Sequence, residues 1–160
     1  MLDYKKISHM LVFIFGGSGD LNFRKLNPAL FNLFLDGAMP ENFSIVGISR
    51  SEFDDGVYEN RLKEGIDNFS RRKDTDEKWV LFSNHISYLS MDVNDIAEYS
   101  KLEKIAKDTE ARFGVHPNII FYMAVAPQLV PAIVKNLGKL SVCHDRKCTR
   151  IVIEKPFGHD

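Results

Sequence analysis

Short apolar blocks alternate along the chain with longer stretches in which apolar positions recur at helical spacing. The apolar blocks predict β-strands over residues 10–15, 43–49, 85–93, 118–125 and 149–158. The helical spacing between them predicts helices over residues 21–37, 52–72, 77–85, 95–114 and 127–140. Strands that alternate with helices favour a parallel sheet covered by helices on both faces.

The helix predicted over residues 21–37 has one apolar face. That face is made of Leu26, Leu30, Leu33 and Phe34. Pro28 lies early in the segment, where proline is tolerated, and Gly37 is placed to end the helix. The strand over 118–125 is a nearly continuous apolar run, which is typical of a strand buried on both faces.

The composition is that of one globular domain. The chain has 160 residues, of which 44% are hydrophobic and 27% charged, with a formal net charge of -1. This charge argues against nucleic-acid and membrane partners, and no apolar run approaches the roughly 20 residues that cross a bilayer. We therefore expect a cytoplasmic protein. Cys143 and Cys148 flank His144 without a second ligand pair, so we expect two free thiols and no metal.

A glycine-rich turn follows the first predicted strand and opens the first predicted helix. Dinucleotide-binding folds begin in this way, although Ser18 and Leu21 stand where the fingerprint G-x-G-x-x-G has its second and third glycines. In this turn we expect Gly16 to leave the strand tightly, Gly19 to allow close backbone approach, and Ser18 to offer its backbone N–H and hydroxyl to a phosphate. We expect Asp20 to cap the helix. The fold predicted is a doubly wound, Rossmann-like α/β sheet of strand order 3-2-1-4-5; the alternative for the turn alone is an ordinary strand-to-helix connection.

The second predicted strand ends in Arg50, flanked by Ser49 and Ser51. Domains specific for NAD usually place an acidic residue here, on the ribose 2′-hydroxyl. A guanidinium instead matches the geometry of a phosphate group. Arg50 therefore favours NADP, unless it is simply an exposed arginine at a helix start.

Three further segments end at the same predicted edge of the sheet, where such folds bind ligands. Asp92 and Val93 close the third strand and could border an adenine. The small residues of the segment that closes the fourth strand leave room for a coenzyme; they are Ala124, Val125, Ala126 and Pro127. Lys155 follows the fifth strand, and its ammonium could bind a substrate or orient a coenzyme. Simple strand termination is the alternative for the third and fourth strands.

Four segments together resemble the N-terminal domain of the glucose-6-phosphate dehydrogenase family, in its bacterial form. They read FGGSGDLNFRKLNPALFNLF, IVGISRS, FYMAVAP and RIVIEKPFGHD, in this order. Asn22, Phe23 and Asn27 depart from the usual family residues, and we expect little effect from these changes. The resemblance implies a dinucleotide-binding domain over 1–160, with the C-terminal substrate and dimerisation domain absent.

The resemblance also implies roles. Gly16 to Leu21, Asp20 included, would hold the phosphates of NADP, Arg50 the 2′-phosphate, Asp92 and Val93 the adenine end, and Ala124 to Pro127 the nicotinamide end. Lys25 would face the active-site cleft. Lys155 would contact glucose 6-phosphate and the nicotinamide, and Pro156 would be a cis-proline.

No catalytic residue is expected in the chain, because the family's general-base histidine lies beyond the segment that ends at Asp160. We therefore expect NADP binding, with NAD possible as a second coenzyme, but no turnover of glucose 6-phosphate. A homodimer is expected only with the missing domain. Two alternatives are a sugar dehydrogenase of the Gfo/Idh/MocA type and a non-catalytic nucleotide-binding module.

Overall fold

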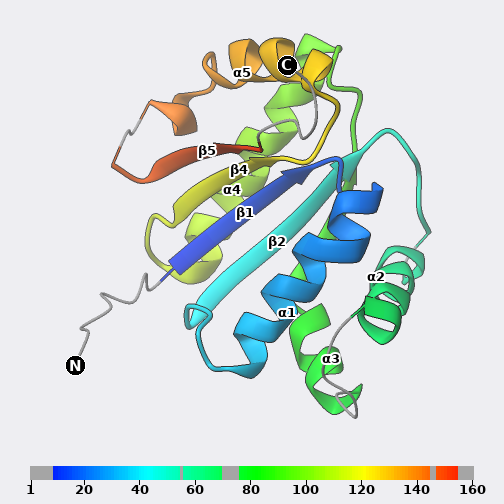
Figure 1. Ribbon diagram of the computed structural model, residues 1–160. Helices are drawn as coiled ribbons and strands as arrows, with labels where there is room; N and C mark the ends of the chain where they lie inside the picture. The colour runs from blue at the N-terminus through cyan, green and yellow to red at the C-terminus, as the bar shows by residue number, and fades with distance from the viewer. Residues whose placement is uncertain (1–8, 55, 70–75, 145–146, 155–160) are drawn as a thin grey trace.

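The computed structural model describes residues 9–54, 56–69, 76–144 and 147–154. Its strands are β1 (His9–Phe15), β2 (Asn42–Ser49), β3 (Ile86–Ser90), β4 (Asn118–Met123) and β5 (Thr149–Ile153). All neighbouring strands are parallel, in the order β3-β2-β1-β4-β5 (Figure 1). This arrangement confirms the predicted fold class and strand order.

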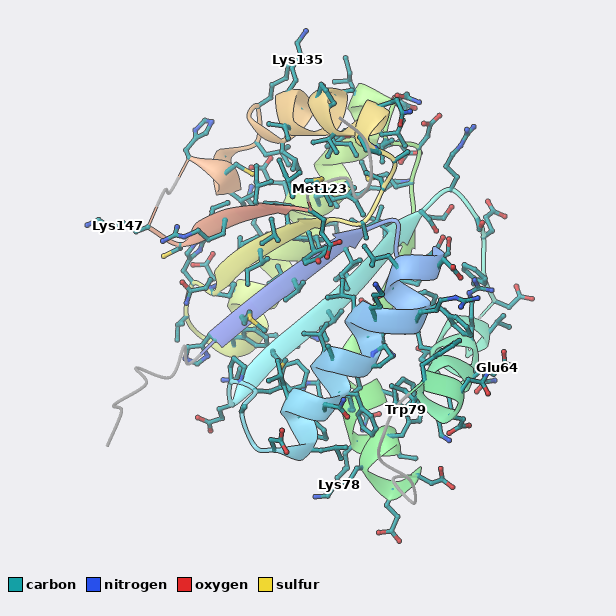
Figure 2. All side chains as sticks on the ribbon, in the orientation of Figure 1. Glu64, Lys78, Trp79, Met123, Lys135 and Lys147 are labelled. Atoms are coloured by element: carbon teal, nitrogen blue, oxygen red, sulfur yellow. The ribbon has the colours of Figure 1, made fainter. Side chains whose placement is uncertain are left out.

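Helices cover the two faces of the sheet. The α-helices are α1 (Asn27–Leu35), α2 (Val57–Phe69), α3 (Asp76–Ser83), α4 (Ser100–Phe113) and α5 (Val130–Leu137). Figure 1 shows α1, α2 and α3 on the near side of the sheet, with α4 behind it. Two separate apolar cores result. In one of them, Trp79 of α3, which Figure 2 labels, packs edge-on against a ring of α1. That ring is Phe31, and the two ring centroids are 5.5 Å apart. In the other, α4 and α5 pack against the opposite face of the sheet.

The central strand is the most deeply buried, whereas β4 is less covered than its sequence suggests. Residues 10–15 of β1 are all buried, because strands lie on both sides and helices on both faces. In β4, buried residues alternate with half-buried ones, among them Ile120 and Tyr122. The expectation of burial on both faces is therefore wrong for β4. In Figure 1 the helices α1 to α3 lie toward the β2 side of the sheet, away from β4.

The first predicted helix is not one continuous α-helix. A π-helix, η1 (Asn22–Leu26), precedes α1, and the backbone N–H of Asn27 donates to the carbonyl of Asn22, five residues back. Within α1 the buried residues are Asn27, Pro28 and Phe31, and Phe31 packs against Trp79 and Phe82 of α3. Leu33 is 45% exposed, so the predicted apolar face is wrong at Leu33. Gly37 has φ +69° directly after the helix, as predicted for a helix-ending glycine.

The remaining elements confirm the prediction with shifted ends. The helix predicted over 95–114 begins with a 3₁₀ turn (Ile96–Tyr99) and continues as α4, which Gly114 ends with φ +77°. The helix predicted from Pro127 likewise begins with a 3₁₀ turn, Pro127–Leu129, before α5. Among the described residues, no helix has the length and apolar character needed to cross a membrane.

Candidate functional site

The glycine turn is wedged between β2 and β4 at the carboxyl edge of the sheet. The backbone N–H groups of Gly16 and Gly17 both donate to the carbonyl of Ile48, at 2.8 and 2.9 Å. A Cβ on Gly16, whose φ is +84°, would lie 2.1 Å from the carbonyl oxygen of Ala124. A Cβ on Gly17 would lie 2.6 Å from the Cα of Gly47. Both positions require glycine because backbones meet there, which confirms the tight departure of Gly16 from the strand.

The hydrogen bonds of the turn decide which of its donors can reach a ligand. The backbone N–H groups of Gly16 and Gly17 already donate to β2, as described above. The N–H of Gly19 donates to the carbonyl of Gly16 at 2.9 Å. The backbone N–H groups of Ser18, Asp20 and Leu21 donate to no acceptor among the described residues. These three groups lie at the start of a helical run, where an anion is favoured by the N–H groups and by the helix dipole.

Asp20 does not cap the helix as predicted. Phe23 donates its backbone N–H to Gly19, so the helical run already includes Asp20 and the cap position falls on Gly19. The exposed carboxylate of Asp20 instead pairs with Arg24 one turn later, at 3.0 Å. The negative charge of the Asp20 carboxylate is thus compensated by the Arg24 guanidinium on the surface of the same helix.

Two buried side chains hold the turn from beneath. The carbonyl oxygen of Gly17 accepts hydrogen bonds from Asn22 Nδ2 at 2.8 Å and from the hydroxyl of Tyr58 at 3.1 Å. A trans peptide directs its C=O and N–H to opposite sides, so fixing the Gly17 carbonyl inward directs the N–H of Ser18 outward. Burial, and then the neighbouring Tyr88, raises the pKa of Tyr58 well above its ordinary range.

These supporting residues were missed at the sequence level. Tyr58 lies over Gly47, where a Cβ would come within 2.0 Å of its hydroxyl oxygen. A glycine inside a strand pattern signals close approach of another group, so Gly47 was the available signal. Asn22, expected to matter little, is fully buried at the centre of this support, and its Oδ1 has no hydrogen-bond partner.

Arg50 follows β2 directly, and its side chain is exposed. The hydroxyl of Tyr88 donates to the carbonyl of Ser51 and accepts from the hydroxyl of Ser49, so it spans the two residues beside Arg50. Ser90 also donates its hydroxyl to the Arg50 carbonyl, at 3.1 Å. The backbone that carries the guanidinium is thereby held on β3, while the guanidinium itself is open to solvent.

The end of β3 is a compact turn. Asp92 accepts a hydrogen bond from the backbone N–H of Asn94 through Oδ1, at 2.9 Å. The side chain of Val93 packs in the core, and its carbonyl accepts from the buried hydroxyl of Tyr99 at 2.7 Å. Asp92 therefore keeps a half-buried carboxylate near the sheet edge, whereas Val93 offers the site little beyond its backbone.

A cavity of about 420 Å³ lies at the carboxyl edge of the sheet, where the glycine turn that follows β1 meets the ends of β4 and β5. Leu21 of the turn and Ala124, Val125 and Pro127 from the end of β4 share its lining with Glu154. Ala126 is exposed beside them. The structure thus brings together the glycine turn and the segment after β4, which the sequence analysis had proposed as two separate contacts with one coenzyme. The size is within the range of small-molecule sites.

The polar group at the far side of this cavity is Glu154, which accepts a hydrogen bond from the hydroxyl of Tyr122. Burial, and then the carboxylate of Glu154, raises the pKa of Tyr122 to about 12. The phenol therefore stays protonated at neutral pH and acts there as a donor to Glu154.

The remaining residues singled out in the sequence do not line this cavity or lie outside the described residues. Lys25 is exposed on η1 and does not line it. Lys155 and Pro156 lie outside the described residues. Cys143 and Cys148 are free thiols, and burial raises the pKa of Cys143 to about 11. The described residues contain no group of three or more acidic, histidine or cysteine side chains that could hold a metal ion.

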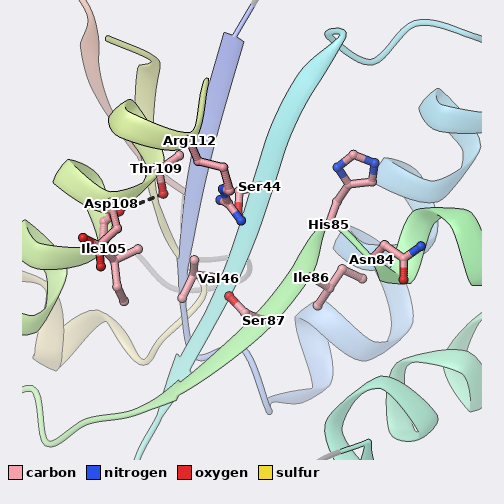
Figure 3. A pocket seen from close by; sticks show the side chains of 10 residues that line it. All are labelled: Ser44, Val46, Asn84, His85, Ile86, Ser87, Ile105, Asp108, Thr109 and Arg112. Carbon is pink, nitrogen blue, oxygen red and sulfur yellow. Dashed lines mark hydrogen bonds between the residues drawn. The ribbon is translucent and has the colours of Figure 1, made fainter. Parts of the chain in front are cut away.

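A second cavity, of about 280 Å³, lies away from the turn, where α4 crosses β2 and β3. Figure 3 shows Arg112 reaching from α4 toward Ser44 of β2, beside Thr109. Ser44 and His85 lie in the amino-terminal halves of their strands or before them, whereas the glycine turn lies at the carboxyl ends. This cavity is therefore separate from the candidate coenzyme site.

A parallel sheet of this order, with a glycine turn and a cavity at its carboxyl edge, defines a dinucleotide-binding α/β domain. The sequence model described as "Glucose-6-phosphate dehydrogenase, NAD binding domain" matches residues 13–160. The chain belongs to this family.

Relatives and solved structures agree with this assignment. The chain is 37% identical to glucose-6-phosphate 1-dehydrogenase of Leuconostoc mesenteroides over 92% of its length, and 33% identical to that of Bacillus subtilis over 94%. It also resembles the structure of a glucose-6-phosphate dehydrogenase in complex with its substrate glucose 6-phosphate, with a TM-score of 0.79, 30% identity and 94% of the chain covered. The chain spans about 30% of the length of each of these proteins.

Proposed function

We propose that this chain binds NADP along the carboxyl edge of the sheet, as the coenzyme domain of an enzyme that oxidises glucose 6-phosphate. The observation that carries the proposal is the pairing of two features at that edge. Three unused backbone N–H groups lie in the glycine turn, and a cation, Arg50, stands at the end of β2 in place of the acidic residue of an NAD site.

The residues of this chain would divide the coenzyme between them. The N–H groups of Ser18, Asp20 and Leu21 donate to the pyrophosphate, and the Arg50 guanidinium binds the 2′-phosphate. Asp92 and Val93 border the adenine. The small residues that follow β4 leave room for the nicotinamide, in the cavity that Leu21 closes from the turn. NAD would bind more weakly, because it lacks the phosphate that Arg50 pairs with.

The reaction proposed for the whole enzyme is oxidation of glucose 6-phosphate at C1, which gives 6-phosphogluconolactone. NADP, when bound, supplies the hydride acceptor. The C1 hydroxyl must lose a proton as the hydride leaves, so a general base is required. Lys25 and Lys155 would contribute to sugar-phosphate binding through their ammonium groups, as the resemblance implies. Since that resemblance places the base outside these 160 residues, the isolated chain would bind the coenzyme without turnover.

A titration of both coenzymes would test the binding proposal. Calorimetry on the wild-type chain and on Arg50→Ala compares NADP with NAD, and Arg112→Ala on α4 serves as a matched loss of a distant arginine. A charge-assisted hydrogen bond contributes about 1.5–3 kcal/mol, so we expect Arg50→Ala to weaken NADP binding by about 10- to 100-fold and NAD binding little. An equal loss for both coenzymes would contradict the 2′-phosphate role.

The second part of the proposal needs a turnover assay. The isolated chain, supplied with NADP and glucose 6-phosphate, should form no NADPH above the level of a control without protein. Sustained NADPH formation would show that a general base lies within these residues. Absence of binding by either coenzyme would overturn the proposed function altogether.

A further inference from the structure

Arg61 of α2 reaches back to the glycine turn, although nothing in the sequence singled it out. Its Nη2 donates a 3.0 Å hydrogen bond to the carbonyl oxygen of Ser18. Tyr58 precedes Arg61 by three residues, so the two side chains lie on the same face of α2. Because Tyr58 donates to the carbonyl of Gly17, this face of the helix holds two successive carbonyl groups of the turn.

The guanidinium of Arg61 is fixed in place by an aromatic ring. Its Cζ lies 5.2 Å from the centre of the Phe23 ring on η1, a distance at which cation–π attraction acts. Phe23 also packs edge-on against Phe69 of α2, with ring centroids 5.6 Å apart. Gly65 permits this close approach, because a Cβ there would lie 2.4 Å from the carbonyl oxygen of Phe23. An arginine fixed in this way loses less conformational entropy when it binds an anion.

The glycine turn links Arg61 to the end of β2. Gly17, the residue before Ser18, donates its N–H to the carbonyl of Ile48 at 2.9 Å. Ile48 precedes Arg50 by two residues. The hydrogen bond between Arg61 and Ser18 therefore lies next to the strand end that carries Arg50.

A second set of contacts brings α2 to the same place. The ring of Tyr58 lies 4.7 Å from the ring of Tyr88 on β3, measured between centroids. The hydroxyl of Tyr88 joins the two serines that flank Arg50. The helix that carries Arg61 is thus packed, through this pair of tyrosines, against the backbone of Arg50.

We propose that Arg61 is a second cation for the 2′-phosphate of NADP and sets the coenzyme preference together with Arg50. This inference rests on the proposed function. A phosphate monoester carries a charge of about −1.5 to −2 at neutral pH, so a single guanidinium leaves part of it unpaired. Arg61 uses one of its five N–H donors on Ser18, and its other donors meet no acceptor within the described part of the chain.

The alternative role for Arg61 is to hold the turn and nothing more. In that role it would support the N–H groups proposed for the pyrophosphate, which NAD and NADP share. Its loss would then weaken both coenzymes equally. A direct contact with the 2′-phosphate concerns NADP alone, so a comparison of the two coenzymes separates the two roles.

Calorimetric titration of the 160-residue chain with NADP, NAD and adenosine 2′-monophosphate would test the proposal. Arg61→Gln keeps N–H donors but loses the charge. We expect it to weaken binding of NADP and of adenosine 2′-monophosphate about tenfold, and binding of NAD by less than about twofold. Arg61→Lys retains the charge and should keep most of the preference for NADP. Arg112→Gln, on α4, is the matched control and should change neither coenzyme.

The dependence on salt supplies a second readout. Because one charge pair is removed, the NADP affinity of Arg61→Gln should fall less steeply with added salt than that of the wild type. Circular dichroism would establish that each variant is folded. Equal weakening of NADP and NAD by Arg61→Gln, or an unchanged salt dependence, would overturn the proposal.

The same titrations separate this inference from the function on which it rests. A wild type that binds neither coenzyme would overturn the proposed function itself. If Arg50→Ala removes the preference for NADP while Arg61→Gln leaves it unchanged, the proposed function stands and only the role of Arg61 fails.

Discussion

The hydroxyl of Tyr58 on α2 donates a 3.1 Å hydrogen bond to the carbonyl oxygen of Gly17 in the glycine turn. Asn22 donates to the same oxygen from η1, at 2.8 Å. The turn is therefore held by side chains from two helical segments, 41 and 5 residues away in the sequence. Because the Gly17 carbonyl and the Ser18 N–H belong to one peptide unit, this support also sets the direction of a proposed phosphate donor.

Tyr58→Phe would remove one of the two donors to Gly17 and the hydroxyl that Asn22 also contacts. We expect the free energy of unfolding to fall by about 1–3 kcal/mol, the effect of leaving buried polar groups without a partner. Urea denaturation would measure it. Tyr122→Phe, whose phenol lies near the surface, is the matched control and should lose less. Equal stability of Tyr58→Phe and the wild type would contradict the supporting role of the hydroxyl.

The same variant predicts a difference at alkaline pH. Burial raises the pKa of Tyr58 in the folded chain, whereas the unfolded chain ionises near the ordinary value of about 10. The stabilising contribution of the neutral phenol is thus complete below about pH 10 and declines as the pH rises above it. Unfolding measured at a series of pH values should show the gap between wild type and Tyr58→Phe narrowing above that point. A constant gap would mean that Tyr58 ionises alike in both states.

Much of this arrangement follows from the sequence, and the limits have physical causes. The strand order and the positions of the turn and of Arg50 follow from local patterns of apolar residues and glycines. The supporting roles of Tyr58 and Tyr88 were not predicted. Their contacts join residues 37 to 41 positions apart, and the periodicity of a sequence indicates only local structure. The π-helix was not predicted either, because residues 21–37 were interpreted at α-helical spacing throughout. The predicted apolar face failed at Leu33 because the side of α1 that is buried is set by contacts of Phe31 with α3, which is distant in the sequence.

Gly17→Ala should be far more damaging than glycine substitutions elsewhere. Its Cβ would meet the backbone of Gly47 at 2.6 Å, and neither strand nor turn can yield without breaking hydrogen bonds. We expect a loss of about 3 kcal/mol or more, as for severe overpacking. Gly37→Ala meets nothing within 4 Å but keeps φ +69°, which costs about 1–2 kcal/mol. Thermal and urea unfolding of both variants compare close packing with backbone strain; similar losses would contradict the close-packing argument.

Tyr88→Phe tests whether the backbone beside Arg50 must be held. The variant loses the hydroxyl that joins Ser49 to Ser51. Under the proposed function we expect the preference for NADP over NAD to fall several-fold, because the guanidinium is less well placed, while the fold persists. Competition titrations with both coenzymes would measure the preference. Ser83→Ala, which removes an exposed hydroxyl from α3, is the control. An unchanged preference would show that Arg50 needs no support from Tyr88.

Asn22→Asp would place an ionisable group at the centre of the support. Asn22 is 1% exposed, and its Nδ2 lies 2.8 Å from the Gly17 carbonyl. A carboxylate there would be buried and would set one of its oxygens against that carbonyl, so we expect a loss of about 3–5 kcal/mol at neutral pH. The neutral acid, by contrast, can donate to Gly17.

The folded variant should therefore bind the proton more tightly than the unfolded chain, whose aspartate has a pKa of about 3.9. Because the raised pKa is in the folded state, the loss should be largest at neutral pH and shrink as the pH falls through that pKa toward about 4. Urea unfolding at a series of pH values between about 7 and 4 would measure this change in the loss of stability. Asn94→Asp, at an exposed position, should show no such recovery. A loss that is constant with pH would indicate that the aspartate side chain has turned out to solvent and no longer faces Gly17.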